Sequence, residues 1–153
     1  MDFNARMSHM GKQLIALVVI TAVLSIGGIV TSLGLLMDGE AYGYSRVALG
    51  VLGVAGAVLI LVGNDYGKIG LTLVMAWGLI QSVFFATEPD GNFTRQLFDA
   101  LAGASSSTTI NDEVTEFSAI GLNLVGVAMF AFAYACRKQS DYWKNRATRG
   151  FAV

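Results

Sequence analysis

The stretch "GLTLVMAWGLIQSVFFA", residues 70–86, decides the class of fold. It contains no ionisable side chain, and apart from Thr72, Gln81 and Ser82 its residues are apolar or glycine. A helix of about 17–25 such residues crosses the hydrocarbon core of a bilayer. The stretch therefore predicts a membrane-spanning helix, and it raises the question of what Trp77 and Gln81, one helical turn apart, do inside it.

The composition of the whole chain also indicates a membrane protein. Only 14% of its 153 residues are charged and its mean hydropathy is +0.59, whereas soluble domains carry about 25% charged residues. The charges are missing from four long windows and gather between them. We therefore predict an all-α membrane protein, a single four-helix transmembrane domain over residues 1–153, with spans at about residues 14–37, 47–63, 69–86 and 116–136.

Two features of the first half of the chain fix how the predicted spans are divided. The first window is about two dozen residues long and no small-residue cleavage site follows it, so it reads as a span rather than a signal peptide. The segment "GNDYGK", residues 63–68, separates the second and third windows. Because glycine, asparagine and aspartate favour turns, we predict a tight hairpin loop there.

The long polar segment before the fourth span, residues 87–115, is predicted to be an outer loop. Within it we expect a short amphipathic helix from Asn92 to Gly103, because its large apolar residues share one side. The serine- and threonine-rich residues 104–109 are expected to form a flexible link. Asn111 is then placed to cap the helix of the fourth span.

The distribution of basic residues predicts the orientation in the membrane. Lysine and arginine are concentrated in the N-terminal tail and in the C-terminal tail, residues 137–153, whereas the outer loop is acidic with Arg95 as its one basic residue. The positive-inside rule therefore places both termini in the cytoplasm, which is the parity that four spans require. This pattern is typical of an integral protein of a bacterial cytoplasmic (inner) membrane, in contact with membrane lipids.

Small residues gather on one side of the second predicted span. At about 100° per residue they lie within about 140° of the helix circumference, and small residues let helices approach closely in lipid. This face predicts either packing within the chain or an interface with another subunit. The residues concerned are Gly50, Gly53, Gly56, Ala57 and Gly63.

Polar residues in three of the predicted spans are expected at similar depth, in a layer formed by Thr31, Gln81 and Asn123 with Trp77 beside it. One interpretation is structural: Gln81 and Asn123 hydrogen-bond to each other, and Trp77 packs beneath them. The other is a ligand site for a polar solute or for the head of a quinone or pigment, with Trp77 as its wall.

Residues that would carry chemistry are missing from the predicted spans. No Asp, Glu, Lys, Arg or His lies in the first three spans or in the fourth from Phe117 onward, which disfavours proton-coupled transport. The single histidine, His9, lies in the N-terminal tail, so haem ligation by two histidines and a serine–histidine hydrolytic pair are excluded within the bundle. We therefore expect no enzymatic activity, no metal, no cofactor and no nucleic-acid partner.

These features favour a non-catalytic integral membrane subunit. We expect it to pack into a larger membrane complex, or into a homo-oligomer, through the glycine-rich helix faces. The alternatives are a small channel or carrier for a neutral solute, or an accessory subunit that binds a quinone, pigment or lipid through the polar layer.

Overall fold

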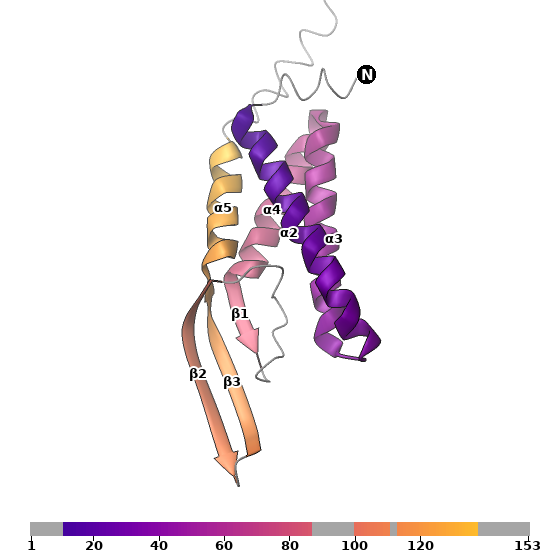
Figure 1. The fold of residues 1–153 in the computed structure, drawn as a ribbon. Coiled ribbons are helices and arrows are strands. Elements are labelled where there is room, and N and C mark those ends of the chain that lie inside the picture. The colour runs from indigo at the N-terminus through magenta and orange to yellow at the C-terminus, as the bar shows by residue number, and fades with distance from the viewer. Residues whose placement is uncertain (1–10, 87–99, 111–112, 138–153) are drawn as a thin grey trace, which may run out of the picture.

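The computed structural model describes residues 11–86, 100–110 and 113–137. Over these residues the protein is mostly helical, with four helices and a small antiparallel sheet (Figure 1). In chain order the elements are α2 (Lys12–Met37), α3 (Ala41–Val62), α4 (Asn64–Ser82), β1 (Val83–Ala86), β2 (Leu101–Ile110), β3 (Glu113–Asn123) and α5 (Leu124–Cys136).

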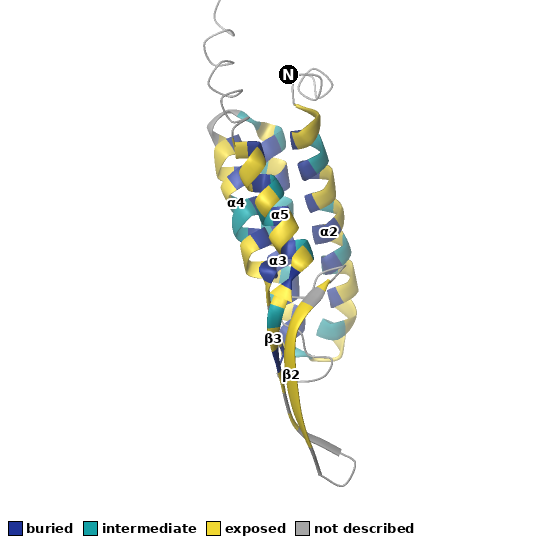
Figure 2. Ribbon diagram, turned by 90° about the vertical axis from the view of Figure 1, so that its left-hand side faces the viewer, coloured by how far each residue is buried: buried dark blue, intermediate teal, exposed yellow. Residues whose placement is uncertain are grey.

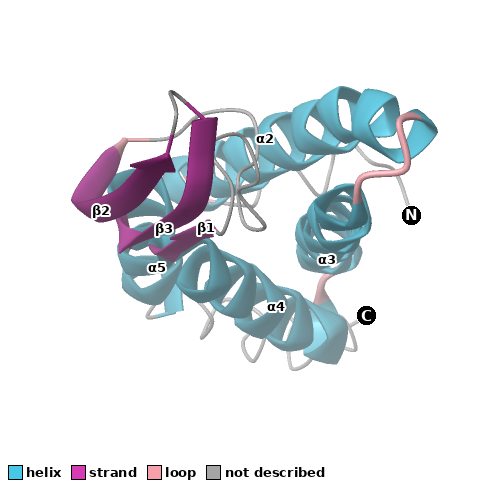
Figure 3. Ribbon diagram, turned by 90° about the horizontal axis from the view of Figure 1, so that it is seen from below, coloured by secondary structure: helices cyan, strands magenta, loops and turns pink. Residues whose placement is uncertain are grey.

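The helices form a bundle in which α3 lies between α2 and α4, and α4 also packs against α5. The start of α2 and the end of α5 lie at one end of the bundle, which we call the tail end (Figure 1). The sheet continues from α4 and α5 at the opposite end, the sheet end. Seen from below, the strands lie on the side of α5 and away from α3 (Figure 3).

A single glycine joins α3 to α4. Gly63 has a φ of 74°, a left-handed conformation that glycine adopts without steric cost, and it reverses the chain between Val62 and Asn64. The prediction of a hairpin loop over residues 63–68 is therefore wrong beyond its first residue. The polar residues after Gly63 already belong to α4, because the residue types that favour turns also favour the first turn of a helix.

The prediction of an all-α fold is wrong at the sheet end. Residues 83–86 form β1 instead of the last turn of a helix, and residues 116–123 belong to β3 instead of the fourth span. Residues 104–109 lie in β2 and are not a flexible link. An apolar run of this length does not by itself distinguish helix from strand. Most of the predicted amphipathic helix, together with Asn111, lies outside the described residues.

The three strands pair in the order β1-β3-β2, and both pairings are antiparallel. β1 pairs with the last residues of β3, from Val83 opposite Leu122 to Ala86 opposite Ala119. β2 pairs along the whole of β3, so the β2–β3 ribbon extends past β1 and past the helices (Figure 1). Residues 102–108 are exposed on both faces of this ribbon (Figure 2).

Two helices, α2 and α3, are long and apolar enough to cross a membrane. The helix α5 is apolar but has 13 residues, which span about 20 Å at 1.5 Å per residue. The four-span topology and the cytoplasmic position of both termini stay predictions.

The packing of α3 generates a prediction at Gly56. A Cβ atom there would lie 2.8 Å from Val74 Cγ2 and 3.1 Å from the backbone oxygen of Gly70, so Gly56→Leu overfills the contact between α3 and α4. We expect it to lower the free energy of unfolding by about 1–3 kcal/mol, seen as a lower Tm in detergent. Gly34→Leu is the matched control, because nothing lies within 4 Å of its Cβ position. An equal loss in both variants would contradict the packing.

Candidate functional site

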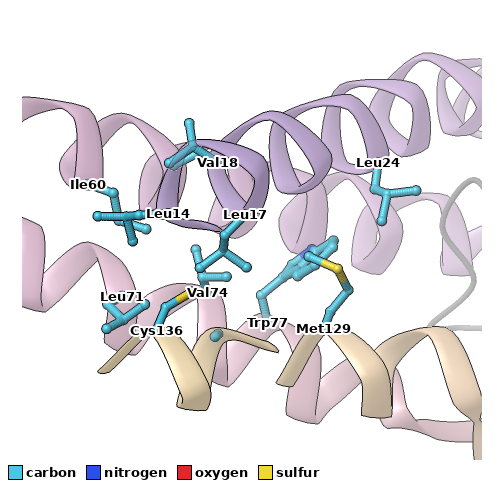
Figure 4. Close-up of a cluster of buried hydrophobic side chains, with 12 residues drawn as sticks. Leu14, Leu17, Val18, Leu24, Ile60, Leu71, Val74, Trp77, Met129 and Cys136 are labelled. Carbon is cyan, nitrogen blue, oxygen red and sulfur yellow. The ribbon is translucent and has the colours of Figure 1, made fainter. Parts of the chain in front are cut away.

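The tail-end half of the bundle interior is aliphatic. Side chains from all four helices fill it, and they are almost completely buried (Figure 4). Apart from the Cys136 thiol, their side chains carry no polar group. The residues are Leu14, Leu17, Val18, Ile60, Leu71, Val74, Ala133 and Cys136.

Nearer the sheet end, the inward-facing residues of α2 and α4 include polar side chains. Thr21 and Ser25 are one turn apart on α2, and Trp77 and Gln81 are one turn apart on α4. All four residues are at most 1% exposed. We call these four residues the Trp77 cluster.

The two helices of the Trp77 cluster meet at a glycine of α3. A Cβ atom on Gly53 would overlap Ser25 Oγ and lie 2.9 Å from Trp77 Nε1. The hydroxyl from α2 and the indole N–H from α4 therefore converge on the same point of the α3 backbone. Met129 of α5 lies beside the indole ring (Figure 4), so side chains from α2 and α5 and the backbone of α3 surround Trp77.

Each member of the Trp77 cluster has a buried polar atom without a hydrogen-bond partner. These atoms are Thr21 Oγ1, Ser25 Oγ, Trp77 Nε1 and Gln81 Nε2. A buried polar atom left unpaired costs about 1–3 kcal/mol, and native proteins have few of them. Four such atoms in one region of a 153-residue chain therefore make this cluster the candidate site.

Asn123 has a different role from the one predicted. Its Oδ1 accepts a hydrogen bond from Val125 N at 3.0 Å, which caps the N-terminus of α5, and a longer one from Ala100 N at 3.5 Å. Gln81 Nε2 donates to no group. The two residues are buried in the same region, since the first turn of α5 packs against the Gln81 backbone, but the amide nitrogen of Gln81 does not bond to Asn123.

Thr31 lies outside the polar interior. It is exposed, and its hydroxyl donates to Gly27 O and Gly28 O of its own helix. The buried polar residues that α2 contributes to this interior are Thr21 and Ser25, whereas the sequence predicted Thr31. Their spacing of four residues, continued by the buried Gly28 and Ser32, places them on one helix face and is the signal that identifies them.

The small residues of α3 pack within the chain. A Cβ atom on Gly50 would meet Ile29 and the backbone oxygen of Ser25 on α2, whereas Gly56 faces α4. Ala57 is buried beside Gly56 in the core. Gly63 is the turn between α3 and α4 and not part of this face. The face predicted as an intramolecular or intermolecular contact is thus used inside this chain.

The polar groups of the Trp77 cluster are all neutral. Within the described residues there is no group of three or more histidine, cysteine, aspartate or glutamate side chains that would hold a metal ion. The buried charge on α3, Arg46, lies about two turns from Gly53 toward the sheet end, with its guanidinium 5.0 Å from the Tyr42 ring centroid. The arrangement therefore offers hydrogen bonds and no acid, base or redox group. Comparisons of the chain with protein-family models, curated proteins and solved structures gave no match.

The capping bond of Asn123 yields a prediction for the junction of sheet and helix. Asn123→Ala removes the acceptor for Val125 N and is expected to lower the free energy of unfolding by about 0.5–2 kcal/mol. Asn123→Ser restores a capping oxygen and should recover most of that loss. Thermal unfolding in detergent measures both variants. If Asn123→Ala costs no further free energy of unfolding in a Gln81→Ala background, the result would instead support a hydrogen bond between the two amides.

Proposed function

We propose that this protein is a non-catalytic integral membrane subunit that crosses a bacterial inner membrane four times with both tails in the cytoplasm. The observation that carries the proposal is the apolar outer surface of the helices. Large apolar side chains are exposed along α2 and α3, with Val30 61% exposed and Val23 56% (Figure 2). Lipid solvates such a surface, whereas a soluble monomer rarely exposes so much contiguous apolar area.

The apolar surface continues from α5 onto the base of the sheet. Val83 and Phe85 of β1 lie opposite Leu122 and Ile120 of β3, and all four side chains are exposed. The helix α5 supplies about 20 Å of apolar length, and four strand residues at about 3.3 Å each add about 13 Å. Together they cover about 33 Å, enough for the hydrocarbon core of about 30 Å, which supports a fourth crossing shared between helix and strand.

A sheet at this depth favours association with another chain. Unpaired backbone N–H and C=O groups are costly in or near hydrocarbon, and β2 is an edge strand of the sheet that the described residues form. Its residues from 101 to 108 include no charge and no proline, the usual features that block pairing between edges. We propose that β2 pairs with β2 of a second copy, because antiparallel pairing of one strand with itself forms a closed two-fold interface.

The hydrogen-bond pattern identifies the residues that face the partner. Leu124 N donates to Ala100 O, and bonded pairs alternate along an antiparallel ladder. The register is continuous as far as Thr108, so even-numbered residues of β2 bond toward β3. The odd-numbered residues Gly103, Ser105 and Ser107 direct their backbone groups toward the open edge.

The second candidate is a small channel or carrier for a neutral solute, or an accessory subunit that binds a quinone, pigment or lipid. The unpartnered polar atoms of the Trp77 cluster favour it. The two candidates differ in where the functional contact lies: at the outer sheet edge in the first, and inside the bundle in the second.

The orientation is tested with reporter fusions. We expect a reporter that is active only in the cytoplasm to be active at Val153, and a reporter that is active only in the periplasm to be active near Ser106. The reason is the concentration of lysine and arginine in the tails. Periplasmic activity at Val153 would overturn the orientation.

The proposed β2–β2 contact is tested with proline. Ser105→Pro removes an edge N–H while leaving the bonds from β2 to β3, so we expect the native mass in mild detergent to fall from dimer to monomer with little change in Tm. Ser106→Pro is the control, because it removes an N–H that faces β3 and should lower the Tm. A wild-type monomer, or a dimer that survives Ser105→Pro, contradicts the contact.

A further inference from the structure

The unpartnered atoms of the Trp77 cluster define the chemistry that they require. The indole nitrogen of Trp77 and the amide nitrogen of Gln81 are donors only, and the hydroxyls of Thr21 and Ser25 both donate and accept. The complement of this set is therefore an acceptor. No ionisable side chain lies on the faces of α2, α3, α4 and α5 that meet at the cluster, since Arg46 lies about two turns away along α3.

We propose that the Trp77 cluster is a binding site for a neutral ligand with an acceptor oxygen, which is a water molecule or the carbonyl oxygen of a small neutral molecule. This site deepens the second candidate function and is independent of the proposed contact through β2.

Direct bonding between the members cannot satisfy all four residues. A bond from Trp77 N–H to Ser25 Oγ across Gly53 would use two of the unpartnered atoms. Gln81 lies one turn beyond Trp77 toward the sheet, and Thr21 lies one turn from Ser25 in the opposite direction. Trp77 Nε1 and Gln81 Nε2 are both donors, so they cannot satisfy each other, and each needs an acceptor.

The donor set defines the ligand group. A carbonyl oxygen has two lone pairs and can therefore accept hydrogen bonds from both donors. A water oxygen can accept in the same way, and water can in addition donate to Ser25 or Thr21. Both sources therefore share the acceptor oxygen, and the experiment must distinguish them.

The first arm of the test uses the indole of Trp77 as a reporter. The chain has a second tryptophan, Trp143, so Trp143→Phe leaves Trp77 as the only indole. With ¹⁵N-labelled tryptophan in detergent micelles, we expect NMR cross-peaks between water and the Trp77 indole N–H if water is the ligand. Gln81→Leu in this background should remove the cross-peak and shift the fluorescence emission of Trp77 to shorter wavelength.

The second arm searches for an organic ligand. Protein purified in mild detergent is extracted with organic solvent, and the extract is analysed by mass spectrometry. A carbonyl compound that is present at about one per chain, and is lost in Gln81→Leu, identifies that source. Thr72→Val is the matched control, because the Thr72 hydroxyl bonds to Lys68 O on the exposed side of α4 and its removal should leave either ligand in place.

The sign of the stability change provides an independent readout. If the site is dry, Gln81→Leu and the isosteric Thr21→Val remove unpaired polar groups and should raise the Tm. If a ligand is bound, both variants lose its hydrogen bonds and should lower the Tm. A raised Tm, together with no water cross-peak and no extracted compound, overturns the proposal. So does an indole signal that changes with Ser25→Ala but not with Gln81→Leu.

Discussion

The close approach of α3 to both of its neighbours is the constraint on which the rest of the bundle depends. Gly50 lets the backbone of α2 come near, and Gly56 does the same for α4. In lipid, the environment that we propose for this bundle, there is no hydrophobic force between helices, so close backbone packing is a main source of their association. The single-residue turn at Gly63 then holds α3 and α4 together, and α5 completes the bundle through Gly78 and Gly126, where a Cβ atom on either would meet the backbone of the other helix.

That close packing also creates the polar interior. With no side chain on Gly53, the inner faces of α2 and α4 meet directly, and Ser25 and Trp77 converge across α3. A larger residue at position 53 would displace Ser25 or Trp77. The glycines are therefore more than spacers, because they determine which side chains of α2 and α4 share an environment. The same backbone feature supports both the stability of the bundle and its one candidate site.

The sequence predicted the helical, apolar character of the chain, because exclusion of charge from long windows is a property of single residues. It failed where the answer depends on partners distant in the chain. Residues 116–123 are as apolar as a helix end, and only their pairing with β1 and β2 makes them a strand. The depth of Gln81 and Asn123 was estimated from helix rise, which places both near one level. Whether they bond depends on the strand-to-helix junction at Asn123, which the rise does not reveal.

Thr31 and Ser32 show why the sequence did not predict the residues that α2 contributes to the site. They are adjacent, yet Thr31 is exposed and Ser32 is buried, because neighbouring residues on a helix are separated by about 100°. To decide which of the two is buried, one must know which face of α2 points toward the bundle axis. Apolar residues occur on both sides of α2, so they do not identify that face. In a soluble helix the polar face supplies it. In a chain whose outer surface is also apolar, small and polar residues mark the interior, and Thr21, Ser25, Gly28 and Ser32 together indicate the buried face that the larger side chains of α2 do not.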